Sequence, residues 1–377
     1  MRRIMLLAAQ DKKPSIGGVW SPDAGWANRS SRVQIMEPTY RLRSDDAVSS
    51  SELPSDFTPR DELLGEMHAL VDGLEGGEVE LGCEVLGVEE VSETETVLTY
   101  SQDGEHKTRV CTEVIFCTGG LQTRREVTYP GEAEFAGPIV EGNGGGPDTL
   151  DFEGKHVLIL GMGAFAVENV RTCLLGGAAR VTVLTRSVNL VVSRVAIFLG
   201  FQASQKLERG MDIAAKQKAA IEAMKKAAAA KAAAASEGED QQEGAAASRK
   251  APPFDPAALI DAPYKLAGIE HLLPQNNVGG QNNAGGTIPA GNDIFFVGTA
   301  LGRVETLQGE VERVVEGGVV TTDGEQIDGE IIIKNFGFEP PDAHLANLVG
   351  RSNIRSPIWI TPRMMLFKAE HNMSLGA

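Results

Sequence analysis

The sequence has little cysteine or histidine, and neither is arranged as a metal or disulfide site. It contains four cysteines and six histidines, without a C-x-x-C pair and without the clustering that metal ligands need. Neither a zinc site nor a disulfide framework is therefore predicted, and no metal ligand is assigned. Serine, histidine and aspartate form no arrangement typical of a hydrolase, so nucleophilic catalysis of that kind is not indicated.

Long apolar runs and an excess of positive charge are also missing. No segment reaches the roughly 20 apolar residues that a membrane-spanning helix requires, and the apolar run within Met1–Ala9 is too short for a signal peptide. We therefore expect a cytoplasmic protein without a membrane span. The formal net charge of −17 disfavours nucleic acids and anionic membrane surfaces as partners. The pattern indicates no oligomeric state.

Length and composition predict two globular domains and one low-complexity segment. The chain has 377 residues, of which 42% are hydrophobic, and chains of this length usually fold as more than one domain. Residues 214–250 are rich in alanine and lysine and end in a polar run. We expect a low-complexity insertion over about residues 205–252, since such a segment cannot bury enough surface to order itself.

The most informative segment is an apolar strand that runs directly into a glycine turn. Residues 155–160 form the strand, and Gly161, Gly163 and Ala166 match the pattern G-x-G-x-x-A at the start of a helix. In a dinucleotide-binding turn the first glycine permits a tight reversal and the second lets the backbone approach a diphosphate. The small third residue allows the helix to pack closely on the strand. The diphosphate would lie at the positive N-terminus of that helix.

The next strand supplies the residue that selects the nucleotide. Residues 180–185 have strand character at the spacing of a βαβ unit, and Arg186 follows them. An acidic residue there would bind the ribose 2′-hydroxyl of NAD, whereas a guanidinium pairs with the 2′-phosphate of NADP. We therefore interpret the site as NADPH-selective. The alternative is that Arg186 is only a solvated residue that caps the strand.

β structure is predicted on both sides of this unit, with one helix before it. The helix is expected after an N-cap at Thr58, with Pro59 as its first residue, and it is expected to end at Gly76 and Gly77. Strands are expected at residues 3–9, 79–81, 83–85, 96–100, 108–110, 114–116, 294–297, 310–315, 319–322 and 331–333.

In this order the motifs resemble those of the flavin-containing monooxygenases, in which an NADPH domain is inserted into an FAD domain. The matching segments are Gly17-Gly18-Val19-Trp20 with the family's G-G-x-W, Cys117-Thr118-Gly119 with its A-T-G linker, the Gly161 turn and Arg186 with its NADPH site, and Asn335-Phe336-Gly337-Phe338 with a second linker. The resemblance implies an α/β protein with two Rossmann-like domains. Residues 1–147 would be an incomplete FAD-binding domain, 151–334 the NADPH-binding domain with the insertion, and 335–377 the return to the FAD domain.

The resemblance implies FAD and NADPH as cofactors, and a small nucleophilic substrate and O₂ as partners. NADPH would reduce FAD, and a flavin hydroperoxide would transfer one oxygen to a soft nucleophile such as an amine or a sulfide. Asn28 is the candidate catalytic residue, because its amide could hydrogen-bond the flavin oxygen adduct. The cofactor-binding candidates are Gly17, Gly18, Trp20, Val85, Thr118, Gly119, Gly161, Gly163, Ala166 and Arg186.

Three departures from the family pattern bear on activity. No G-x-G-x-x-G for the FAD diphosphate precedes residues 3–9, Glu141 stands where the fingerprint F-x-G-x-x-x-H has histidine, and residues 334–337 are bulkier than A-T-G. One alternative is therefore a non-catalytic NADPH-binding paralogue that acts as an interaction protein. Another is a pyridine-nucleotide disulfide oxidoreductase, although Cys111 and Cys117 are separated by five residues across a predicted strand, which argues against a redox pair.

Overall fold

The computed structural model describes residues 8–22, 25–34, 58–74, 77–92, 94–112, 114, 123–197, 256–273 and 290–339. The described α-helices are α1 (Arg60–Asp72), α2 (Ala164–Leu175), α5 (Pro256–Leu266) and α6 (Asp293–Ala300). Short 3₁₀ helices cover Gly18–Trp20, Glu132–Glu134, Gly146–Thr149 and Glu270–Leu272.

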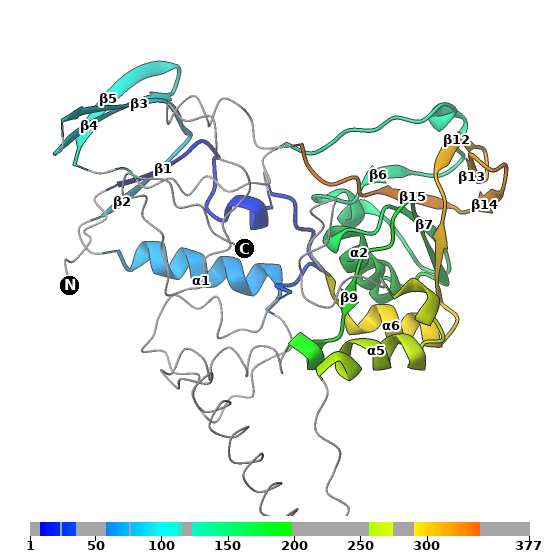
Figure 1. The fold of residues 1–377 in the computed structure, drawn as a ribbon. Coiled ribbons are helices and arrows are strands. Elements are labelled where there is room, and N and C mark those ends of the chain that lie inside the picture. The colour runs from blue at the N-terminus through cyan, green and yellow to red at the C-terminus, as the bar shows by residue number, and fades with distance from the viewer. Residues whose placement is uncertain are drawn as a thin grey trace, which may run out of the picture.

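A five-stranded parallel sheet forms the larger region of the molecule (Figure 1). Its strands, in spatial order, are β11 (Val304–Gln308), β8 (Arg180–Thr185), β7 (His156–Leu160), β15 (Ile331–Lys334) and β6 (Ile139–Glu141). The register aligns the carboxyl ends of the four last strands, because Leu184 pairs with Leu160, Leu160 with Lys334, and Lys334 with Glu141. The residues that follow these four strands therefore lie at one edge of the sheet.

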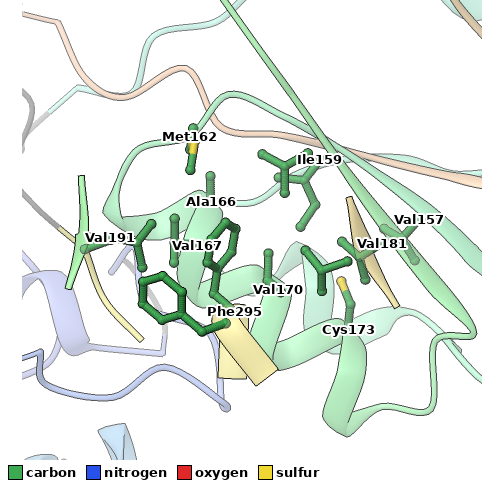
Figure 2. Packing of buried hydrophobic residues seen from close by; sticks show 14 of the residues in the cluster. Val157, Ile159, Met162, Ala166, Val167, Val170, Cys173, Val181, Val191 and Phe295 are labelled. Atoms are coloured by element: carbon green, nitrogen blue, oxygen red, sulfur yellow. The ribbon is translucent and has the colours of Figure 1, made fainter. Parts of the chain in front are cut away.

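Both faces of the parallel sheet are buried, which explains the continuous apolar runs of its strands. On one face Val157 and Ile159 belong to one cluster with Ala166, Val167 and Val170 of α2, and Figure 2 labels all five residues. The same cluster includes residues of α5 and α6. On the other face Leu158, Leu160 and Ile332 pack against an antiparallel sheet of β12 (Val311–Val315), β13 (Gly318–Thr321) and β14 (Gln326–Asp328).

The remaining strands lie outside this sheet. β9 (Val191–Val192) pairs with β10 (Ala290–Gly291) in parallel, and β1 (Ala8–Asp11) pairs with β2 (Glu78–Leu81) in parallel. β3 (Cys83–Ser92), β4 (Glu95–Gln102) and β5 (Glu105–Cys111) form an antiparallel sheet, on the opposite side of Figure 1 from the parallel one. Arg109 of β5 joins these two groups, since its guanidinium lies 3.1 Å from a carboxylate oxygen of Glu78 and 2.9 Å from one of Glu80.

Residues 294–297 were predicted as a strand, and this prediction is wrong. They lie inside α6, which begins after Asn292, whose side-chain oxygen accepts a hydrogen bond from the backbone N–H of Phe295. This bond caps the helix. A short apolar run alone does not distinguish a buried strand from a buried helix, and here the Asn292 cap and the packing of Phe295 against α2 select the helix.

The first helix begins one residue later and ends earlier than predicted. α1 starts at Arg60 with Pro59 in the cap position and without a side-chain cap, while Gly73 follows its last residue. Thr58 does not cap the helix; its carbonyl oxygen accepts a hydrogen bond from the N–H of Val33. The prolyl φ angle fits the helix start, but the extended pairing of Thr58 delays it by one residue.

Several predicted segments lie outside the described residues. They are most of the strand at residues 3–9, the strand at 115–116 with the A-T-G-like linker, the insertion at about 205–252 and residues 340–377. Within the described part of the chain, no helix is long and apolar enough to cross a membrane. The same described ranges contain no group of three or more histidine, cysteine, aspartate or glutamate side chains that could hold a metal ion.

Candidate functional site

The glycine turn after β7 has the geometry that its sequence pattern predicts. Gly161 has a φ angle of +104°, a left-handed conformation that favours glycine. A Cβ atom at this position would lie 2.4 Å from the carbonyl oxygen of Asn335, at the end of β15. Gly161 therefore satisfies two constraints: the reversal of the chain and the close approach of the neighbouring strand end.

The N-terminus of α2 is open to a ligand. Gly163 occupies the cap position, no side chain caps the helix, and a Cβ atom built on Gly163 would have no heavy atom within 4 Å. Ala166, one turn further, is fully buried against the strand. The first N–H groups of a helix carry partial positive charge and need acceptors. This turn can therefore receive the diphosphate of a dinucleotide.

Arg186 lies directly after β8, at the same edge of the sheet. Its side chain is 73% exposed, and a guanidinium nitrogen lies 3.4 Å from a carboxylate oxygen of Glu310. An exposed ion pair of this kind contributes only about 0–1 kcal/mol, so a phosphate could replace the carboxylate at little cost. The position suits a 2′-phosphate contact.

Asn28 is buried in a network that joins the loop of residues 25–34 to α2. Its amide nitrogen donates to the side-chain oxygen of Asn169 at 2.7 Å, and its side-chain oxygen accepts from the N–H of Ser30 and the hydroxyl of Thr172. Asn169 in turn donates to the carbonyl of Gly142 at 2.9 Å and to the side-chain oxygen of Asn335 at 3.1 Å. Asn28 is thus held next to the strand ends of the candidate site, with most of its hydrogen-bonding capacity used inside the protein.

The other candidates are distributed more widely. Gly17 precedes the 3₁₀ helix Gly18–Trp20 with φ +118°, and its Cα packs so closely on α1 that a Cβ would lie 2.4 Å from a methyl carbon of Leu64. Trp20 is half-buried. Val85 lies on β3 and packs against the small core of the antiparallel sheet, away from the glycine turn. Thr118 and Gly119 lie outside the described residues.

A buried lysine at the edge of the sheet was missed in the sequence. Lys334, the last residue of β15, is 8% exposed, and its ammonium donates to the carbonyl of Val127 at 2.8 Å. It also lies 3.2 Å from an oxygen of Glu141 and 3.3 Å from one of Glu132. Glu141, the residue at the histidine position of the fingerprint, is therefore paired with a cation. A lysine that ends an apolar strand was the only local signal.

A second buried ion pair lies on α2, where the apolar pattern gave no sign of it. Glu168 and Arg171 are both about nine-tenths buried or more, and the guanidinium Nε lies 3.0 Å from a carboxylate oxygen. Burial raises the pKa of Glu168 to about 7, although the positive charges of Arg171 and Arg32 oppose this rise. Both side chains belong to α2, and the side-chain nitrogen of Asn292, the cap residue of α6, lies 3.5 Å from the other carboxylate oxygen of Glu168.

Comparison with curated proteins gives seven significant matches, while no family model matches. The FAD-containing monooxygenase EthA of Mycolicibacterium smegmatis is 33% identical over 104 residues, which is 27% of this chain and 21% of that protein. "Probable FAD-binding monooxygenase AlmA" of Acinetobacter baylyi is 25% identical over 239 residues, 62% of this chain and 44% of that protein. Over these stretches the chain is similar to proteins named as FAD-containing or FAD-binding monooxygenases. It spans less than half the length of these two relatives.

Solved structures support the fold of this chain. An open crystal structure of cyclohexanone monooxygenase has a TM-score of 0.57 at 17% identity, covering 90% of this chain and 70% of that one. A steroid monooxygenase bound to NADP also has a TM-score of 0.57, at 18% identity, covering 90% and 67% of the two chains. The predicted α/β fold class with Rossmann-like domains is confirmed, and so is the resemblance on which it was based.

Proposed function

We propose that the chain is part of an NADPH-dependent flavoprotein monooxygenase that uses FAD and oxygenates a soft nucleophile, an amine or a sulfide. The observation that carries the proposal is the joint position of the Gly161 turn, the open N-terminus of α2 and Arg186 at one edge of the parallel sheet. The curated relatives named above support the monooxygenase class. Residues 151–334 would form the NADPH-binding domain, and residues 1–147 and 335–377 would belong to the FAD-binding domain.

The described residues fit NADPH. The space beside Gly163 and the uncapped α2 N-terminus would take the diphosphate, and the exposed guanidinium of Arg186 would take the 2′-phosphate. The described residues that would face FAD are Gly18 and its neighbours. Gly18 has φ +52° and free space where a Cβ atom would point, so a ligand can approach the backbone there.

Bound FAD would supply the redox and oxygen chemistry, and the protein would position the reactants. Asn28 would hold the loop of residues 25–34 against α2 through Asn169, and so would fix the distance between the two nucleotide regions. Its remaining amide N–H is the group that we assign to a hydrogen bond with bound FAD. Exclusion of water from this region would protect the reduced cofactor from side reactions.

The test is the visible absorption spectrum of the purified chain with added FAD, followed by NADPH under air. A flavin band that bleaches and then recovers is the expected result. If NADPH binds but no flavin is retained, the non-catalytic NADPH-binding paralogue is the better description. Asn28→Ala and Asn28→Asp both remove the amide N–H and test the assigned role: the flavin should still be reduced by NADPH, but the product formed per NADPH consumed should fall in both variants.

A further inference from the structure

The helix α2 is buried over most of its length, and one of its sides is polar. Every residue of Ala166–Cys173 is buried, and the apolar members of this run belong to the core cluster formed with the parallel sheet, α5 and α6. The polar members are Glu168, Asn169, Arg171 and Thr172. A fully buried helix is usually hydrophobic all round, so this polar side needs partners of its own.

The partner of the polar side is the loop of residues 25–34. Asn28 of this loop forms side-chain hydrogen bonds with two residues of α2, as described above. The backbone N–H of Arg32 donates to the carboxylate of Glu168. At the start of α2, the side-chain N–H of Gln34 donates to the first carbonyl oxygen of the helix at 3.3 Å. The loop that carries Asn28 is therefore attached to α2 by polar contacts, and Glu168 is the acidic member of this set.

The charge of Glu168 is incompletely compensated. Its Oε1 atom lies 3.0 Å from Nε of Arg171, but neither atom has a hydrogen-bond partner among the described residues, so this contact lacks hydrogen-bond geometry. A buried ion pair regains what its charges lose on leaving water only when its geometry is good and further hydrogen bonds satisfy both groups. The ionised carboxyl is therefore unfavourable at this position.

The groups around Glu168 favour a proton on its carboxyl up to neutral pH. Burial is the largest influence and raises the pKa of Glu168 to about 7, although Arg171 and Arg32 lower it. From α6 comes the neutral amide of Asn292, 3.5 Å from a carboxylate oxygen. Other charged side chains near this cluster act on Arg32 or pair with each other, and they are Glu62 of α1, Arg194 and Asp293. A protonated Glu168 still offers a carbonyl oxygen to the N–H of Arg32.

We propose that Glu168 is a positioning residue whose protonation state sets how firmly the loop of residues 25–34, and with it Asn28, docks on α2. The docked loop helps to bury the carboxyl, whereas undocking would return it to water and to its ordinary pKa. The docked state therefore binds the proton more tightly. Docking is strongest at low pH and weakens as the pH rises through the pKa of the docked state. The inference deepens the proposed function and rests on it for the role of Asn28.

Hydrogen exchange measures the docking on the full chain without any cofactor. The protection of the backbone amides of residues 28–33 is followed from about pH 6 to about pH 8.5, after correction for the intrinsic pH dependence of exchange. In wild type it should fall about 10-fold and level off above about pH 7, as linkage requires for a docked pKa of about 7. The amides of β7 should stay more protected at every pH, which shows that the opening is local.

Glu168→Gln keeps the shape and the acceptor oxygen of the side chain but cannot ionise. The protection of its loop amides should not change with pH, whereas the exposed control Glu84→Gln on β3 should retain the wild-type profile. With FAD and NADPH present, the product formed per NADPH consumed should fall over the same pH range in wild type and in Glu84→Gln, but not in Glu168→Gln.

A flat exchange profile in wild type overturns the inference, whatever the flavin spectrum shows. Loop amides that exchange as slowly as those of β7 also overturn it, and so does a wild-type profile in Glu168→Gln. The wild-type profile is decisive by itself if Glu168→Gln does not fold. If the exchange profiles are as expected but the chain retains no flavin, the proposed function fails while the docking role of Glu168 stands.

Discussion

The parallel sheet and the antiparallel sheet β3–β4–β5 are stabilised by different means. In the parallel sheet Val157, Ile159 and Val183 are fully buried, and helices or a second sheet cover both faces. In the antiparallel sheet the described core consists of Cys83, Leu98 and Tyr100, with partly buried neighbours. Val91 and Val110 on this sheet are more than half exposed. Ion pairs from Arg109 to β2 add a polar contact in place of a second core.

The difference shows where positional accuracy is concentrated. A nucleotide site needs strand ends that are fixed to a fraction of an ångström, and dense packing on two faces provides this for β6, β7, β8 and β15. The antiparallel sheet, with one thin core, has no such requirement in the site described above. Changes in the parallel sheet should therefore be more damaging than comparable changes in the antiparallel sheet.

Gly161→Ala should be the most damaging single change. The new Cβ atom would lie 2.4 Å from the carbonyl of Asn335 in a backbone with φ +104°, so the strand ends must separate. We expect a loss of roughly 4 kcal/mol in the free energy of unfolding, measured by urea denaturation. Gly163→Ala is the matched control, since its Cβ would meet free space; it should leave stability unchanged but weaken NADP⁺ binding. Equal stability of the two variants would contradict this account.

Truncation of one core residue in each sheet tests the comparison directly. Ile159→Ala should cost about 3–4 kcal/mol, because the side chain is fully buried between helices and sheet and the cavity cannot collapse. Leu98→Ala should cost about 2 kcal/mol, since the thin core around it can relax or admit water. Thermal and urea unfolding of both variants gives the comparison. The distinction between the sheets fails if Leu98→Ala is as destabilising as Ile159→Ala.

Glu168 should make the stability of the chain depend on pH. Its pKa rises from 4.5 in the unfolded chain to about 7 when folded, so between these values the folded state binds a proton that the unfolded state has released. Stability should therefore fall as pH rises from about 4.5 to 7, by on the order of 3 kcal/mol, and change little above 7. Urea unfolding across this range measures the slope.

Glu168→Gln should remove this slope, while Glu84→Gln, an exposed position on β3, should retain it. A slope that is unchanged in Glu168→Gln would place the titrating group elsewhere. The comparison between regions becomes sharper if the slope depends only on α2, because the buried charge is then a property of the densely packed side of the molecule.

The βαβ unit was predictable from the sequence because its signals are local. The local sequence determines the conformation of each part: the apolar strands at residues 156–160 and 180–185, the glycines of the turn and the small Ala166. The strands β12, β13 and β15 were predicted on the same basis, whereas the short strand β14 was not. By contrast, β6 has only three residues and β11 has no distinctive pattern. These strands form because they pair with β8 and β15, and a local sequence pattern does not predict such pairing.

The buried polar groups of the site were not predictable for the same reason. Lys334 forms ion pairs with Glu132 and Glu141, both of which lie far from it in the sequence. Asn28 was selected by resemblance, and its partner Asn169 on α2 was not anticipated. The helix α6 was predicted as a strand because its cap at Asn292 was not recognised. Tertiary contacts decide the first two cases, whereas the cap of α6 is a local contact three residues apart.

The central claim is that the edge of the parallel sheet holds NADPH with Arg186 at its 2′-phosphate. The most direct measurement is the ratio of the Kd values for NADH and NADPH, by calorimetry, in wild type, Arg186→Gln and Arg180→Gln. Arg180 is the matched control, because it is an exposed arginine at the opposite end of β8. We predict that wild type and Arg180→Gln bind NADPH at least about 10-fold more tightly than NADH, and that Arg186→Gln does not. Equal affinities in wild type, or an unchanged preference in Arg186→Gln, would contradict the claim.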